Sequence, residues 1–158
     1  SKFLNAYYAN ENGVNSRLDE IQSSILNIKI KKIKSYIETR RKIANMYFEG
    51  LKNTNLTLPT ENQNTKHVYH LFTVYHPKAA KIQKKLIEKG IQVRKIYPFP
   101  VHKMKAYSNI KQPSNNSLKN TILKSKGIFC LPLYPELKVY EVKKIIKTLL
   151  KILEKNNF

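Results

Sequence analysis

The chain is poor in the residues from which many enzyme sites are built. It has four glycines, one cysteine, no tryptophan and only 10 acidic residues among 158. The glycines, Gly13, Gly50, Gly90 and Gly127, are too widely scattered to form a glycine-rich phosphate loop. The acidic residues are sparse and fall mostly on expected helices, which argues against a pair of catalytic carboxylates.

The single cysteine, Cys130, excludes an internal disulfide and fits a reducing compartment. It lies in the apolar run GIFCLPLY, which favours a buried, inert thiol over a nucleophile. A nucleophilic pair with His102 is conceivable, but nothing in the sequence supports it. His67 and His70 lack zinc-site spacing, because a three-residue step on a strand turns the two side chains to opposite faces. We therefore expect no catalytic residue and no metal site in this chain.

No apolar run approaches the roughly 20 residues that a membrane-spanning helix needs, and no signal peptide is visible. The sequence begins with Ser-Lys-Phe rather than methionine. We expect a soluble cytoplasmic protein, or a piece of one, with no membrane partner.

Basic residues dominate the charge, because 30 Lys and Arg against 10 acidic residues give a formal net charge of +20. Most of them are lysines, and the accompanying abundance of Asn and Ile is typical of a proteome-wide compositional bias. One alternative function is a small basic module that binds nucleic acid or another anion without catalysis. Against it, lysines are spread over every expected helix and no recognised nucleic-acid-binding motif is present. We therefore expect no specific nucleic-acid partner.

Residues 16–52 carry apolar side chains at three- and four-residue steps, which predicts one long helix. Ser16 is expected to cap this helix, with Asp19 completing a capping box. A helix of that length would extend about 54 Å, long enough to bridge two bodies. This divides the chain into an interface segment with a linking helix, residues 1–52, and a small C-terminal domain, residues 53–158.

The second part alternates between strand and helix patterns. In chain order the patterns predict a strand at 67–76, a helix from Pro77 to Gly90, a strand at 91–97, a short helix from Ser117, a strand at 127–133 and a helix from about Val139 to Leu153. Pro98 and Pro100 make the intervening loop irregular. This order predicts an α+β fold, in which the long N-terminal helix precedes a small, mostly antiparallel three-stranded sheet covered by helices.

Three separated polar clusters stand out: Asn15 with Arg17, residues 67–70, and residues 97–102. With their surroundings they give the ordered segments GVNSRLDEIQSSIL, KHVYHLF, GIQVRKIYPFPVHKMKAY and CLPLYPELKVYEVKKII. In this order the segments resemble the last third to half of the pyridoxal-phosphate-dependent sugar-nucleotide aminotransferases, the DegT/DnrJ/StrS group of fold type I. Each motif alone is weak, whereas four in the right order over almost the whole chain are specific.

The resemblance implies an enzyme that moves an amino group, usually from glutamate, onto a nucleotide-linked keto sugar in the synthesis of surface polysaccharide. Such enzymes are homodimers that share their active sites at the subunit interface. Their larger N-terminal domain supplies the Schiff-base lysine, and the resemblance begins after that domain. We therefore expect the chain to be inactive alone, as part of a longer enzyme or as a partner of a separate large-domain chain.

The resemblance also assigns roles to Asn15 and Arg17. It implies that Asn15 reaches across the dimer interface to the cofactor phosphate of the other subunit. Arg17 would face the anionic cofactor or the nucleotide, because a forked guanidinium matches phosphate oxygens. The amino end of the helix would act on the same anion. The alternative is that Asn15 and Ser16 merely cap the helix while Arg17 is solvated.

Substrate contacts are implied for the other two clusters. By resemblance, His67, Tyr69 and His70 lie near the sugar-binding mouth; the alternative is cross-strand packing with a solvated histidine tip. Tyr97 and His102 stand in the proline-stiffened loop that resembles the family's substrate-facing loop. The family often has a histidine just before this tyrosine.

The present chain departs from the family there, because Ile96 precedes Tyr97. The sugar contacts that the resemblance implies for this loop therefore lack that histidine.

Overall fold

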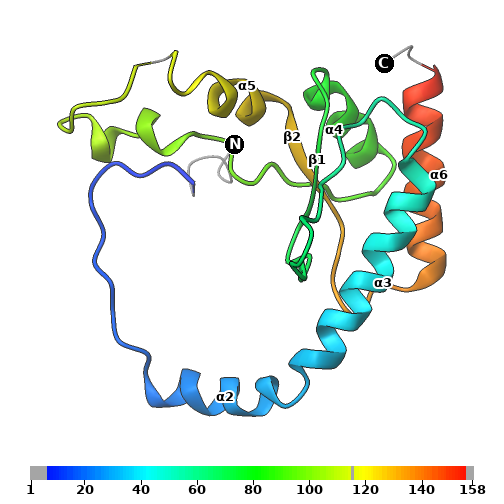
Figure 1. Cartoon of the computed structure of the whole chain (residues 1–158), viewed down its shortest axis with the longest axis horizontal. Coiled ribbons are helices and arrows are strands. Elements are labelled where there is room, and N and C mark those ends of the chain that lie inside the picture. Colours follow the sequence, from blue (N-terminus) through cyan, green and yellow to red (C-terminus); the bar gives the residue numbers. More distant parts are fainter. Residues whose placement is uncertain (1–6, 115, 156–158) are drawn as a thin grey trace.

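The structure is a computed structural model that describes residues 7–114 and 116–155. At its centre lies a two-stranded antiparallel sheet of β1, Phe72–Tyr75, and β2, Ile128–Leu131 (Figure 1). The register pairs Phe72 with Leu131 and Tyr75 with Ile128. Helices pack against this sheet, so the predicted α+β class is confirmed.

The third expected strand, residues 91–97, contributes only one isolated bridge, between Arg94 and Cys130. The next hydrogen-bonded pair of that register would join Gln92 to Pro132, which has no N–H to donate. The ladder therefore cannot extend from the bridge in that direction. The expected strand at 67–76 is likewise shortened to β1, because Tyr69 adopts a left-handed backbone with φ of 46°.

The expected long helix is two helices, α2 at Glu20–Ile30 and α3 at Ile33–Leu51. The break falls at Lys31 and Lys32, within a run of lysines whose like charges give a continuous helix no support. The expected capping box is also wrong. Asp19 is itself the N-cap, and its carboxylate accepts the backbone N–H of Gln22 at 2.8 Å.

The remaining helices follow the sequence prediction closely. They are α4 at Ala79–Glu88, α5 at Lys119–Gly127 and α6 at Val139–Lys155, with two short 3₁₀ turns, η1 at Val101–Lys103 and η2 at Lys105–Tyr107. Gly90 ends the α4 region with a φ of 76°, a conformation that glycine adopts without strain.

The core lies where α3, α4 and α6 meet one face of the sheet (Figure 1). The largest fully buried side chains include Tyr47 of α3, Phe72 of β1, Phe129 of β2 and Leu149 of α6. The α3–α6 contact is close, since a side chain at Gly50 would come within 2.7 Å of Ile146. The buried residues of α3, Ile43, Ala44, Tyr47 and Leu51, all lie in its C-terminal half, so only that half takes part in this core.

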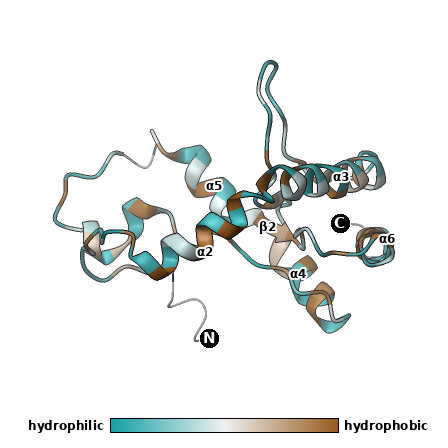
Figure 2. Ribbon diagram, turned by 90° about the horizontal axis from the view of Figure 1, so that it is seen from below, coloured by the Kyte–Doolittle hydropathy of each residue, from teal (hydrophilic) through white to brown (hydrophobic). Residues whose placement is uncertain are grey.

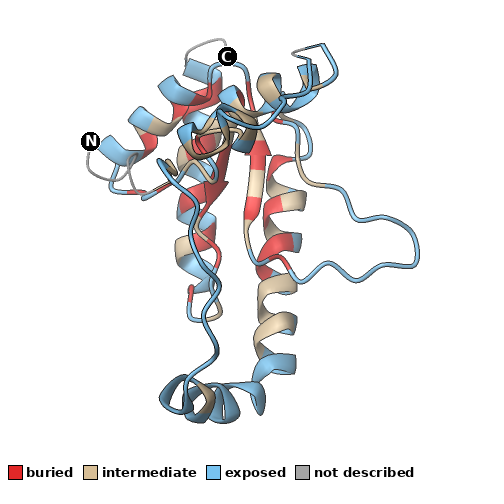
Figure 3. Cartoon of the chain, turned by 90° about the vertical axis from the view of Figure 1, so that its left-hand side faces the viewer, coloured by how far each residue is buried: buried red, intermediate tan, exposed pale blue. Residues whose placement is uncertain are grey.

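By contrast, α2 buries none of its residues (Figure 3). Apolar side chains on and beside it are all at least half exposed: Leu18, Ile21, Ile25, Leu26, Ile28 and Ile30. Figure 2 shows hydrophobic positions along α2, and Figure 1 shows that this helix lies away from the sheet. Within the described residues, no helix is long and apolar enough to cross a membrane.

The exposed apolar face of α2 predicts that the isolated chain self-associates, because burying apolar surface is favourable. Replacing Ile21, Ile25 and Ile28 with serine should lower the association constant at least tenfold in analytical ultracentrifugation, since three large side chains are removed from the contact. The matched control is Ile87→Ser, which removes a side chain that is 57% exposed on α4. A wild-type chain that stays monomeric at high concentration would contradict the prediction.

Candidate functional site

Asn15 and Arg17 lie in an extended, exposed segment, residues 10–19, that leads into α2 (Figure 3). No hydrogen bond or ion pair is formed by either side chain to any residue the structure describes. The alternative in which Asn15 and Ser16 cap the helix is wrong, because Asp19 does so. Both donors are therefore free to bind a group outside this chain.

The segment that carries Asn15 begins against the proline-stiffened loop. The rings of Tyr7 and Tyr97 meet edge to face with centroids 5.7 Å apart, and those of Tyr8 and Phe99 do so at 5.3 Å. The backbone N–H of Ala106 also donates to the carbonyl of Ala9 at 3.1 Å. These contacts place the start of the segment beside the loop of Tyr97 and His102.

Within that loop, Tyr97 is 62% exposed, and the His102 side chain is only partly exposed. The Nε2 atom of His102 is buried and has no hydrogen-bond partner among the described residues. A buried ring nitrogen without a partner is costly. The same loop borders a largely apolar cavity of about 620 Å³, which is lined by Tyr97, Phe99 and Met104 together with part of α5.

The cluster at residues 67–70 lies at the opposite end of the sheet. Residue 70 precedes β1, whose first residue Phe72 pairs with Leu131. Tyr97 lies near the other end of β2. The chain runs antiparallel to β2 from the Arg94–Cys130 bridge, and Tyr97 lines the same cavity as Ile128, the first residue of β2. The structure thus brings Tyr97 and His102 together with the N-terminal segment, but not with His67, Tyr69 and His70.

An ion pair organises the second cluster. The Arg41 guanidinium binds the Glu61 carboxylate through two contacts, at 2.8 and 3.2 Å, and donates to the His67 carbonyl at 2.6 Å. The Tyr69 hydroxyl lies 3.2 Å from the same carboxylate, and the Tyr69 N–H donates to Nδ1 of His67. The hydrogen bond from Arg41 holds the pKa of Glu61 down at about 2.

Tyr69 is consequently fixed as a core residue. Its side chain is only 3% exposed and packs against Phe48 and Phe72. Burial raises the pKa of its hydroxyl. His70, by contrast, is exposed and its imidazole is free of this network. Of the three sequence-predicted residues here, the exposed histidines can meet a ligand more readily than Tyr69.

The sequence model of the DegT/DnrJ/EryC1/StrS aminotransferase family matches residues 2–150. The chain belongs to this family.

Curated relatives agree with this membership. The chain is 37% identical to the dTDP-3-amino-3,6-dideoxy-alpha-D-galactopyranose transaminase of Aneurinibacillus thermoaerophilus, over 85% of the chain and 36% of that protein. It is 35% identical to the dTDP-3-amino-3,4,6-trideoxy-alpha-D-glucose transaminase of Micromonospora megalomicea subsp. nigra, over 83% of the chain and 36% of that protein. The matched chain therefore spans about a third of the length of these aminotransferases.

Solved structures show the same relation. DesV of S. venezuelae superposes with a TM-score of 0.82 at 30% identity, and the match covers 97% of this chain and 43% of DesV. An aminotransferase of the family from Brucella abortus gives a TM-score of 0.76 at 26% identity, covering 89% of this chain and 37% of the other. The resemblance to a C-terminal portion of the family is confirmed.

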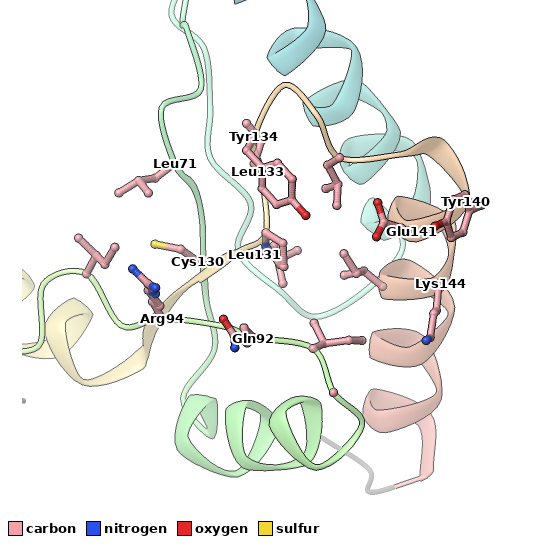
Figure 4. A pocket seen from close by; sticks show the side chains of 16 residues that line it. Leu71, Gln92, Arg94, Cys130, Leu131, Leu133, Tyr134, Tyr140, Glu141 and Lys144 are labelled. Carbon is pink, nitrogen blue, oxygen red and sulfur yellow. The ribbon is translucent and has the colours of Figure 1, made fainter. Parts of the chain in front are cut away.

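A second groove, of about 690 Å³, opens in this family member between residues 90–96 and the chain that follows β2 (Figure 4). Arg94, Tyr134 and Lys144 are among the side chains that line it. Cys130 also borders it, yet this residue is only 5% exposed and burial raises the pKa of its thiol. The prediction that this thiol is buried is confirmed.

Within residues 7–114 and 116–155, no three His, Cys, Asp or Glu side chains are grouped so as to hold a metal ion. Sequence reasoning missed Arg40, which binds backbone carbonyls, and Arg41 with its partner Glu61. The pattern that could have indicated them was the Arg-Arg pair in a helix otherwise rich in lysine, one turn before the buried residue Ile43.

The low pKa of Glu61 predicts an acid-sensitive contribution to stability. The pKa lies near 2 in the folded chain, below the ordinary value of 4.5. The carboxylate therefore stabilises the fold above about pH 4.5, and this contribution is lost as the pH falls toward 2. Glu61→Gln should lower the urea midpoint at pH 7, and the difference from wild type should shrink as the pH falls through this window.

The matched control for this experiment is Glu154→Gln, at an exposed position near the end of α6. Its urea midpoint should follow that of the wild type throughout. A Glu61→Gln effect of the same size at pH 7 and at pH 2.5 would count against the ion pair as its cause.

Proposed function

We propose that this chain supplies the C-terminal portion of a pyridoxal-phosphate-dependent aminotransferase that moves an amino group from glutamate to a nucleotide-linked keto sugar. The observation that carries the proposal is the pair of unpartnered donors, Asn15 and Arg17, on an exposed segment of a family member. The relatives named above act on dTDP-linked sugars, and another, of Acidithiobacillus ferrooxidans, acts on a UDP-linked one. A nucleotide sugar is therefore the substrate class that the family membership supports.

In this proposal residues 1–52 form an interface segment with a linking helix, and residues 53–158 form the small domain. A large domain, in the same chain or in a separate one, supplies the Schiff-base lysine. Support comes from the uncovered apolar face of α2, which has no partner among the described residues. A further support is that the chain spans about 36% of its curated relatives.

The donors present fit a phosphate group. An amide and a guanidinium both offer N–H groups, and neither Asn15 nor Arg17 is engaged within the described chain. We assign Asn15 to the cofactor phosphate of the partner subunit and Arg17 to the same anion or to the nucleotide. When bound, pyridoxal phosphate supplies the electron sink for amino transfer. This chain's part is to bind and orient the anionic groups.

The loop of Tyr97 and His102 is assigned to the substrate. Pro98 is buried and Pro100 restricts the backbone further, so the loop presents its aromatic rings with few accessible conformers. The side chain of His102 is partly exposed, and its imidazole can hydrogen-bond a sugar hydroxyl. His67 and His70 are assigned to the sugar-binding mouth, where the buried ring of Tyr69 packs against His67. Their position at the other end of the sheet suits a contribution to a different site of a dimer.

We further propose a cytoplasmic homodimer that makes amino sugars for surface polysaccharide such as lipopolysaccharide. A nucleic-acid-binding module is the weaker candidate. Lysines occur on α3, α4, α5 and α6 alike and do not form a single stripe. Two of the four arginines, Arg40 and Arg41, are engaged within the chain.

The isolated 158-residue chain should give no Schiff-base absorbance and no turnover with pyridoxal phosphate and glutamate. Both should appear when it is co-expressed with the N-terminal portion of the Aneurinibacillus thermoaerophilus relative. In that complex Arg17→Met should weaken pyridoxal phosphate binding by about tenfold, because a charge-assisted hydrogen bond to phosphate is lost. Absorbance titration measures the effect.

Two controls make this test specific. Binding of pyridoxal, which lacks the phosphate, should be unchanged by Arg17→Met. Lys81→Met, on the exposed face of α4, should behave as wild type with both ligands. Turnover by the isolated chain, or equal loss of pyridoxal and pyridoxal phosphate binding, would overturn the assignment.

A further inference from the structure

Arg40 gathers three backbone carbonyls from two separate parts of the chain. Its Nη1 atom donates to the carbonyls of Tyr69 at 3.3 Å, His70 at 3.1 Å and Leu133 at 3.1 Å. The first two belong to the loop before β1, and the third belongs to the turn after β2. One guanidinium on α3 therefore joins two loops that are more than 60 residues apart in sequence.

Both loops border the second groove, the one of about 690 Å³. Leu71, which follows the His70 carbonyl, and Leu133 with Tyr134 are lining residues (Figure 4). Their separation is not set by the sheet ladder alone, since β1 begins at Phe72 and β2 ends at Leu131. Pro132 cannot donate to a neighbouring strand, and Tyr69 holds a left-handed backbone with φ of 46°. Side chains therefore add to the ladder in holding the two loops: Arg40 reaches both of them, and the Tyr47 hydroxyl donates to the carbonyl of Pro132 at 2.7 Å.

We propose that Arg40 is a positioning residue that fixes His70 and the loop before β1 relative to the turn at Leu133 and Tyr134. The effect on substrate rests on the function proposed above, in which His70 lies at the sugar-binding mouth. Arg40 itself does not touch the substrate. All three contacts come from Nη1, which carries two N–H groups in the guanidinium plane, so one N–H is shared between two carbonyls; a lysine ammonium in the same place lacks this planar geometry.

The adjacent residue provides a matched control. Arg41 binds Glu61 and the His67 carbonyl, and none of its contacts reaches the turn after β2. The two arginines are neighbours on α3 and each contacts the loop before β1. Only Arg40 joins that loop to Leu133, so a comparison of the two separates tethering from general loss of an arginine.

The first test is nuclear magnetic resonance on the 158-residue chain. In Arg40→Met the ¹³C carbonyl shifts of His70 and Leu133 should move upfield. The residual dipolar couplings of Leu71 and Tyr134 should also cease to fit one common orientation. In Arg41→Met the Leu133 shift and the coupling of Tyr134 should stay as in wild type. Arg40→Lys, which keeps the charge and most of the length, should be intermediate and serves if Arg40→Met does not fold.

The second test is kinetic, in the complex with the N-terminal portion of the Aneurinibacillus relative. Arg40→Met should raise KM for the nucleotide sugar on the order of tenfold with kcat changed less than about twofold, because binding geometry is disturbed and the chemistry is not. Arg40→Lys should recover part of the loss. A fall in kcat with KM unchanged would overturn the proposal.

Other outcomes are equally decisive. If Arg40→Met lowers only the melting temperature and leaves the Leu133 carbonyl and the Tyr134 coupling unchanged, Arg40 is not a tether. If Arg41→Met changes them as much, the effect is not specific to Arg40. A wild-type complex without turnover would contradict the proposed function, whereas the carbonyl and coupling measurements would still decide on Arg40.

Discussion

The burial of only one half of α3 is the constraint on which the rest of this structure depends. Ile43, Ala44, Tyr47 and Leu51 lie in the core with the sheet and α6, whereas the earlier residues of α3 and all of α2 lack such cover. Apolar packing therefore ends where the arginine pair begins. Further toward the N-terminus the chain is exposed through α2 and residues 10–19, where Asn15 and Arg17 are found, until Tyr7 and Tyr8 pack on the loop of Tyr97 and Phe99.

The fold was predictable wherever a sequence pattern coincides with local packing. The apolar residues of α6 recur on one face that the core buries, and Gly90 ends its helix because only glycine takes that backbone without strain. One long helix was predicted where there are two, because the spacing of apolar residues takes no account of the like charges of Lys31 and Lys32. The expected strand at 91–97 did not form because Pro132, which has no N–H, stands where the ladder needs a donor. This can be recognised only once the pairing of Arg94 with Cys130 is known.

The candidate site was predictable in part. Order and spacing of the motifs indicated the family, and the structure leaves Asn15 and Arg17 exposed. The separation of residues 67–70 from the loop of Tyr97 was not predictable, because it follows from the antiparallel pairing of segments far apart in sequence. The roles of Arg40 and Arg41 depend on carbonyls and a carboxylate brought to them by tertiary structure, which no local pattern encodes.

Exposure limits what Asn15 and Arg17 can do by themselves. An ion pair in open water contributes only about 0–1 kcal/mol, because solvent and salt screen both charges. The same donors hold phosphate more strongly once a surrounding protein removes water and adds further N–H groups. In the described chain nothing packs over the segment at residues 10–19, so a phosphate there would remain solvated. The same absence of cover that leaves the apolar face of α2 exposed thus leaves the proposed anion site incomplete, and a single neighbouring protein body would cover both.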